Sequence, residues 1–222
     1  DWSSDVCSSD LGQNWFDVSQ HRVNPPLGGP MHWSRLVDVP IAAIILMLRP
    51  LLGEARAELV ACITVPLLTL GIMCFAMFGA VRRFLGVHKA LLTVALLVTS
   101  FPILVQAAPL RIDHHGWQIA MAAFVLWGVL DEKPGRGGMV AGCAMALWLH
   151  ISTEGLPDAA VAGGVIALRY VWRAREWPRL IGYAGALFAA TMVLLLGVRG
   201  PATAMEFHCD GISIAYFPEF FA

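Results

Sequence analysis

The sequence contains few charged residues for its length. Of its 222 residues, 14% are charged and 58% are hydrophobic, and the mean hydropathy is +0.67. A soluble domain has about 25% charged residues, so the composition argues against a soluble globular protein. The net charge of −1 gives no basis for binding nucleic acid through bulk electrostatics, and no nucleic-acid partner is expected.

The chain also lacks any cysteine pattern with a chemical meaning. It has five cysteines, at positions 7, 62, 74, 143 and 209, without the spacing of a metal site. Three of them lie inside apolar runs, where a thiol behaves as a small hydrophobic group. The sequence contains neither an internal repeat nor a low-complexity tract, so no repeat architecture is expected.

The first eleven residues do not resemble a natural N-terminus. Residues 1–11 resemble the translation of a sequencing adapter, and they lack both an initiator Met and the basic-then-apolar layout of a signal peptide. We exclude them from the fold and expect that the natural protein began upstream of Gly12. The last residues have no terminal character, so we expect a cut at that end as well.

Long apolar runs without amphipathic alternation predict membrane helices. We expect an all-α, polytopic integral membrane bundle over residues 40–198, embedded in a lipid bilayer, with an outer loop on each side (12–39 and 199–222). The outer loop 12–39 includes a short interfacial helix over 31–38. Full spans are predicted at 58–81, 90–108 (kinked at Pro102), 117–130 and 180–198.

Three other segments are too short to span. Residues 40–48 give only about 14 Å of helix, which predicts a re-entrant or interfacial segment, or a span completed by the preceding turn. Residues 139–151 and 159–171 are half-length pieces that flank a polar turn, while 131–138 is expected to be a loop. The polar turn between the two half-length pieces is therefore expected below the membrane surface.

The charges segregate once the spans are drawn. With 12–30 placed outside, nine of the fifteen Lys and Arg fall in three short inner loops, in agreement with the positive-inside rule. Seven acidic residues (Asp17, Asp38, Asp113, Glu154, Asp158, Glu206 and Asp210) and six of the seven histidines then lie outside. We therefore expect a site on the outer face, which in a bacterial inner membrane faces the periplasm.

The segment from Arg111 to Gln118 is the most unusual polar stretch, because ionisable groups at a membrane boundary are costly unless they are used. Asp113 and His115 offer a carboxylate oxygen and an imidazole nitrogen, two residues apart, to one divalent ion. Arg111 binds either a phosphate or Asp113 itself. The alternative for the whole stretch is a solvated loop between helices.

Two further groups are candidates. Glu154, one helical turn after His150, is placed to accept a proton or orient a ligand; the alternative is a capped turn at a helix break. His32, Trp33 and Arg35 are candidate substrate-binding residues, with Arg35 on a phosphate and Trp33 on a sugar or in lipid. Their alternative is an interfacial helix that only docks the loop.

The motif Asp113-His114-His115, in an outer loop just before a helix, resembles the second acidic motif of the GT-C membrane glycosyltransferases, in particular the catalytic subunits of oligosaccharyltransferases. The resemblance covers residues 12–198 in layout but few in identity. It implies a polyprenyl-phosphate-linked sugar as donor and a divalent metal ion, Mn²⁺ or Mg²⁺ ahead of Zn²⁺, held by Asp113 and His115. The family's first acidic motif is not recognisable here and would lie upstream of the cut.

The resulting hypothesis is a membrane glycosyltransferase that moves a sugar or glycan from its polyprenyl-phosphate carrier to an acceptor on the outer face. Asp113 and Glu154 are its candidate catalytic residues, and the fragment alone is expected to be inactive. One alternative is a transporter that carries protons or metal ions through a broken hairpin at 150–158. Another is a non-catalytic membrane scaffold. The sequence identifies neither the donor sugar nor the acceptor.

Overall fold

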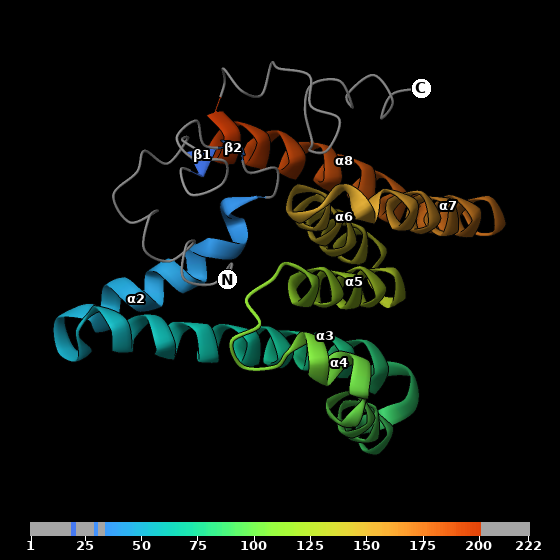
Figure 1. Cartoon of the computed structure of the whole chain (residues 1–222). Helices are drawn as coiled ribbons and strands as arrows, with labels where there is room; N and C mark the ends of the chain where they lie inside the picture. Colours follow the sequence, from blue (N-terminus) through green and yellow to red (C-terminus); the bar gives the residue numbers. More distant parts are fainter. Residues whose placement is uncertain (1–18, 21–28, 31–33, 201–222) are drawn as a thin grey trace.

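The computed structural model describes residues 19–20, 29–30 and 34–200 (Figure 1). Within them, β1 (Ser19–Gln20) pairs with β2 (Gly29–Pro30) in a two-residue antiparallel ladder, and the other regular structure is helical. The long helices are α2 (Asp38–Leu52), α3 (Glu54–Thr99), α5 (His115–Leu130), α6 (Pro134–Ile151), α7 (Leu156–Trp172) and α8 (Trp177–Leu194). The short ones are η2 (Arg35–Val37), α4 (Phe101–Gln106), η3 (Thr153–Gly155), η4 (Ala174–Glu176) and the π-helical turn η5 (Leu195–Arg199). The all-α prediction is confirmed.

The helices form a stack in which each long helix packs on one or two others. α2 runs back along the first part of α3, α5 lies on α3, α6 on α5, and α8 on α6, with α7 beside α8 (Figure 1). The main core is apolar and mostly small, with residues such as Ala76, Ala120, Met145, Leu149 and Ile166 at its centre. A smaller core joins α2 to the first part of α3.

Glycine allows α6 and α8 to approach closely. A Cβ on Gly142 would collide with the carbonyl oxygen of Tyr183 and would lie 2.9 Å from the amide nitrogen of Leu187. A Cβ on Gly182 would lie 2.8 Å from the carbonyl oxygen of Gly135. Small residues are typical of helix pairs whose backbones touch, and they explain why this helix pair has the most extensive contact in the stack.

The predicted loop at 131–138 is wrong over most of its length. α6 begins at Pro134, which suits the first helical position because its φ angle is fixed and it has no N–H. The glycines that follow are used for packing rather than for turning. α6 therefore has 18 residues and α7 has 17, about 27 Å and 25 Å of helix, so neither is the half-length piece that the sequence predicted.

The predicted kink near Pro102 is confirmed as a complete break. α3 ends at Thr99, Ser100 is extended, and Pro102 lies in the first turn of α4, where proline is tolerated. α3 is also interrupted at Gly86, whose φ of 80° is left-handed. α2 runs on past the predicted end at residue 48, through Pro50 to Leu52. α8 begins at Trp177, three residues before the predicted start of the last span at residue 180.

Two of the described helical segments, Glu54–Thr99 and Ala174–Val198, are long and apolar enough to cross a membrane. α5 is apolar but has only 16 residues. Many large apolar side chains point outward, including Phe75, Leu96, Val161 and Val171. An exposed apolar surface of this extent is typical of a protein that contacts lipid or another protein.

An ionic network joins the C-terminal end of α5 to the first turns of α6 and α8. Arg179, 1% exposed, donates hydrogen bonds to the carbonyl oxygens of Gly128 and Asp131, both at 2.5 Å, and to Oε2 of Glu176 at 2.7 Å. Arginine suits this position because its planar group has five donors. The network satisfies carbonyl groups that the end of a helix leaves without partners.

The carboxylate of Asp131 is the second part of this network. It accepts hydrogen bonds from Arg83 at 3.0 Å, from Arg136 at 2.8 Å and from the Lys133 backbone N–H at 2.9 Å. Burial alone would raise the pKa of Asp131, but the hydrogen bond and charge of Arg136, the backbone hydrogen bond from Lys133 and the charge of Arg83 outweigh it and lower that pKa. These basic residues come from the loops predicted to face inward, and here they stabilise the bundle.

Candidate functional site

The stretch from Arg111 to Gln118 forms the turn into α5 and the first turn of that helix. Oδ1 of Asp113 accepts the backbone N–H of His115 at 3.1 Å, which satisfies a donor that a helix start leaves free. Oδ2 of Asp113 accepts Nε of Arg111 at 2.8 Å. Of the two partners predicted for Arg111, the structure therefore gives it Asp113. The carboxylate of Asp113 fixes the start of α5 and thereby the direction of the two histidines.

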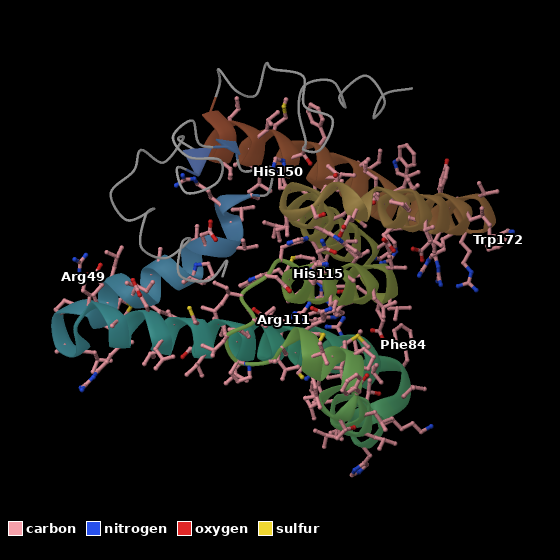
Figure 2. All side chains as sticks on the ribbon, viewed as in Figure 1. Arg49, Phe84, Arg111, His115, His150 and Trp172 are labelled. Carbon is pink, nitrogen blue, oxygen red and sulfur yellow. The ribbon has the colours of Figure 1, made fainter. Side chains whose placement is uncertain are left out.

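His114, His115 and Glu154 converge at this end of α5. One ligand atom from each lies within 4.8 Å of the other two, although Glu154 belongs to η3, between α6 and α7. The two imidazole rings are stacked, with centroids 4.4 Å apart and planes at 27°. Figure 2 shows Arg111 and His115 near the start of α5, in the middle of the view, and His150 above them. We call His114, His115 and Glu154 the candidate metal cluster.

Gln118 orients the carboxylate of Glu154. Its Nε2 donates to Oε2 of Glu154 at 3.0 Å. The pKa of Glu154 is lowered, first by this hydrogen bond from Gln118 and then by the charges of His114 and His115 and a hydrogen bond from Ser152, against the raising effect of burial. A carboxylate that stays ionised is the form that binds a metal ion.

The predicted capped turn is present as well. The Ser152 Oγ accepts the backbone N–H of Glu154 at 3.3 Å and caps η3. The backbone of Glu154 thus forms the turn while its side chain reaches across to α5. The two interpretations of this residue are compatible, because they use different groups.

The donor set of the candidate metal cluster fits a divalent ion. Two imidazoles and one carboxylate suit Zn²⁺, Mn²⁺ or Fe²⁺ better than Mg²⁺, which prefers oxygen ligands. Nδ1 of His115 is buried and makes no hydrogen bond within the described part of the chain, although Oδ1 of Asp113 lies 3.4 Å away. Of the predicted metal pair, His115 belongs to the candidate metal cluster, whereas Asp113 lies next to His115 and is not part of the cluster. A role for Asp113 as a direct ligand stays a prediction.

A cavity adjoins the cluster between α3, α4 and the start of α5. Its volume is about 20 Å³ and it is partly open to solvent, with Arg111, Asp113, Gln106 and Thr69 among its polar lining. Oε1 of Gln106 is buried and has no hydrogen-bond partner among the described residues, and the other lining residues are mostly apolar. A cavity of this size admits a small polar or anionic group rather than a whole ligand.

The other predicted site residues are not in this group. Arg35 lies in η2, which packs on α2 and α6, so its role as a phosphate ligand stays a prediction. His32 and Trp33 lie outside the described residues. His150 is buried on α6, and its Nε2 is 3.1 Å from the carbonyl oxygen of Thr191 on α8.

Sequence reasoning missed two residues of this site. His114 was taken as part of the motif but not as a ligand, and Gln118 was not assigned a role. A signal was available, because residues 114 and 118 lie one helical turn apart and therefore share a face. The partner of Gln118 was not predictable, since Glu154 is 36 residues further along the chain.

No family model, no curated protein and no solved structure matches this chain. The residues of the site and the motif Asp113-His114-His115 are therefore what indicates its function.

Proposed function

We propose that this chain is the membrane part of a metal-assisted glycosyltransferase of the GT-C type. It transfers a sugar or glycan from a polyprenyl-phosphate carrier to an acceptor on the outer face of a bacterial inner membrane. The observation that carries this proposal is the convergence of His114, His115 and Glu154 next to a cavity with mostly apolar walls and one arginine.

The arrangement suits a lipid-linked phosphate. Arg111 supplies a positive charge in the lining of the cavity, where it would meet the phosphate. Arg111 is bonded to Asp113 in the structure, so a phosphate would share it with that carboxylate. The cavity has room for a small polar group only, so the isoprenoid chain would lie outside it, along the exposed apolar side chains of the bundle.

The candidate metal cluster would hold the divalent ion. Bound there, the ion would neutralise the negative charge that develops on the leaving phosphate. Gln118 keeps Glu154 ionised and aimed at the histidines, and Asp113 fixes their backbone. We expect Mn²⁺ or Zn²⁺ ahead of Mg²⁺, because two of the three donors are imidazoles.

The membrane location depends on composition and surface. The two long apolar segments and the outward-facing apolar side chains suit a polytopic bundle in a lipid bilayer. The arginine network lies at the C-terminal end of α5 and the cluster lies at its N-terminal end. The positive-inside rule therefore directs the cluster to the periplasm.

The test is Mn²⁺ binding to the purified chain in lipid nanodiscs, measured by electron paramagnetic resonance. We expect His115→Ala and Glu154→Gln each to weaken binding about 10- to 100-fold, because each removes one ligand. The matched controls are His88→Ala and Glu132→Gln, which change the same residue types elsewhere and should bind as the unchanged chain does.

Transfer from a short polyprenyl-phosphate sugar, with and without Mn²⁺, tests the reaction itself. The proposed site is wrong if the unchanged chain binds no Mn²⁺ or Zn²⁺, or if the control variants lose as much affinity as the ligand variants. The reaction is wrong if the full protein binds the metal but transfers no sugar and does not bind the lipid donor.

A transporter is the second candidate, and the observation in its favour is the buried His150 between α6 and α8. A buried ionisable group in a membrane protein is a functional candidate by default. The lengths of α6 and α7 argue against the broken hairpin on which this candidate was based. Uptake of protons or metal ions into proteoliposomes that requires His150 and is indifferent to lipid-linked sugar would favour it.

A further inference from the structure

Pro66 lies in the interior of α3, where it removes one helical hydrogen bond. Proline has no N–H, so the carbonyl of the residue four positions earlier, Cys62, loses its usual partner. The backbone N–H of Leu110 donates to that carbonyl oxygen at 3.0 Å. A residue from the loop before α5 therefore takes the place of the missing helical donor.

Leu110 adopts an unusual backbone conformation to make this bond. Its φ of 71° is left-handed, and it is the one non-glycine residue with a positive φ among the described residues. The side chain is 54% exposed, so burial of an apolar group does not account for the strain. The backbone hydrogen bond to Cys62 is the compensation that the structure shows, and strained residues of this kind tend to occur at functional sites.

This contact lies directly before the residues that build the site. Arg111, the next residue, turns back through a hydrogen bond from its N–H to the carbonyl oxygen of Ala108 at 3.0 Å. Arg111 then pairs with Asp113, and both line the cavity together with Pro66. One backbone hydrogen bond thus ties the loop that carries Arg111 and Asp113 to α3.

We infer that Pro66 and Leu110 are positioning residues for the site. Pro66 leaves the Cys62 carbonyl as a docking point, and Leu110 binds it so that Arg111 and Asp113 face the cavity and the candidate metal cluster. That this contact serves a metal site rests on the proposed function, but the hydrogen bond between Leu110 and Cys62 is independent of any metal.

The decisive variant is Pro66→Ala, which restores an N–H inside α3 that competes with Leu110 for the Cys62 carbonyl. The matched control is Pro50→Ala, which makes the same change inside α2, away from the site. Three quantities are measured in nanodiscs: amide hydrogen exchange at Leu110, the Asp113 carboxyl carbon chemical shift, and Mn²⁺ affinity.

We expect Pro66→Ala to speed exchange at Leu110, to move the Asp113 shift, and to weaken Mn²⁺ binding about 2- to 10-fold, the effect of one hydrogen bond. Because alanine is a better helix former than proline, the same variant should not lower the stability of the bundle. A loss of affinity without a loss of stability distinguishes positioning from a merely structural role.

Leu110→Gly is the complementary variant, because glycine keeps the N–H and adopts the left-handed conformation without strain. It should keep Mn²⁺ affinity within twofold. The inference is overturned if Pro66→Ala leaves both Leu110 exchange and the Asp113 shift unchanged, or matches Pro50→Ala in all three quantities. A failure of the unchanged chain to bind Mn²⁺ counts against the proposed function, while the exchange and shift measurements still decide the docking contact.

Discussion

Gln118 in the first turn of α5 donates a hydrogen bond from Nε2 to Oε2 of Glu154, which lies in the turn between α6 and α7, at 3.0 Å. Gln118 is buried, whereas Glu154 is exposed. The bond therefore places a carboxylate from a surface turn against the two histidines at the start of another helix. It also holds that carboxylate in its ionised form.

Replacing Gln118 tests this relationship. In Gln118→Met, Glu154 loses its strongest stabilising contact, so its lowered pKa should rise toward the ordinary value of 4.5. Because protonation competes with metal binding, Mn²⁺ affinity should then begin to fall at a higher pH during acidification. The measurement is a carbon NMR titration of the Glu154 carboxyl with parallel Mn²⁺ binding. The control is Gln106→Met, which removes a glutamine that lines the cavity. It should leave the pKa of Glu154 unchanged.

Asp131→Asn should destabilise the bundle. The variant removes a buried carboxylate that pairs with Arg83 and Arg136, at a cost of about 1–3 kcal/mol after allowance for solvent screening of the exposed arginines. The comparison is unfolding in mixed micelles against Glu132→Gln, the exposed neighbour. Equal stability of the two variants would contradict the structural role of Asp131.

The pH dependence of this effect has a defined sign. The pKa of Asp131 is lowered from an ordinary value of 3.8 in the folded chain. Its contribution to stability is therefore fully present above that ordinary value and is lost as the pH falls through the lowered one. Asp131→Asn should lack this acid-dependent component, which a series of unfolding curves between neutral and strongly acidic pH detects.

Gly142→Ala should disrupt the contact between α6 and α8. The added methyl group would meet the backbone of α8, and because backbone cannot move aside as a flexible side chain does, we expect a loss of about 1–3 kcal/mol. Gly185→Ala is the control on α8, since its Cβ has nothing within 4 Å. It should be neutral or slightly stabilising through helix propensity. The free energy of unfolding of both variants is the measurement, and a neutral Gly142→Ala would show that the helices are further apart.

Gly86→Ala should also destabilise the chain, for a different reason. Nothing lies within 4 Å of its Cβ position, but its φ of 80° is left-handed. An L-residue there costs about 1–2 kcal/mol. Gly71→Ala, in the same helix with equally open surroundings and helical backbone, should instead stabilise by about 1 kcal/mol. Thermal unfolding of the two variants in parallel separates backbone strain from steric contact.

The apolar runs were sufficient to predict the helices but not their ends. The α6 start was missed because Gly137 and Gly138 are typical of a loop when read locally. In the structure, the same glycines are helical because the backbone of α8 lies against Gly138 and the C-terminal end of α5 lies against Gly137. A tertiary contact has therefore overridden local propensity, which no single-segment pattern reports.

The sequence predicted individual residues of the site but not which of them lie together. Asp113 and His115 are conspicuous because polar groups beside long apolar runs are costly. Glu154 was conspicuous for the same reason, but nothing local in the sequence connects it to His114 or Gln118. That connection requires α5 and α6 to lie side by side, which is a property of the packed bundle. The bond between Leu110 and Cys62 is beyond local patterns for the same reason.

The glycine contact between α6 and α8 has a consequence for biogenesis. α8 lies within a segment apolar enough to enter a bilayer alone, whereas α6, rich in glycine, does not reach that hydropathy. α6 also leaves the ribosome first, before the helix that covers its glycine face exists. We expect α6 to wait at the translocon until α8 arrives, and the two helices to enter the membrane as a pair.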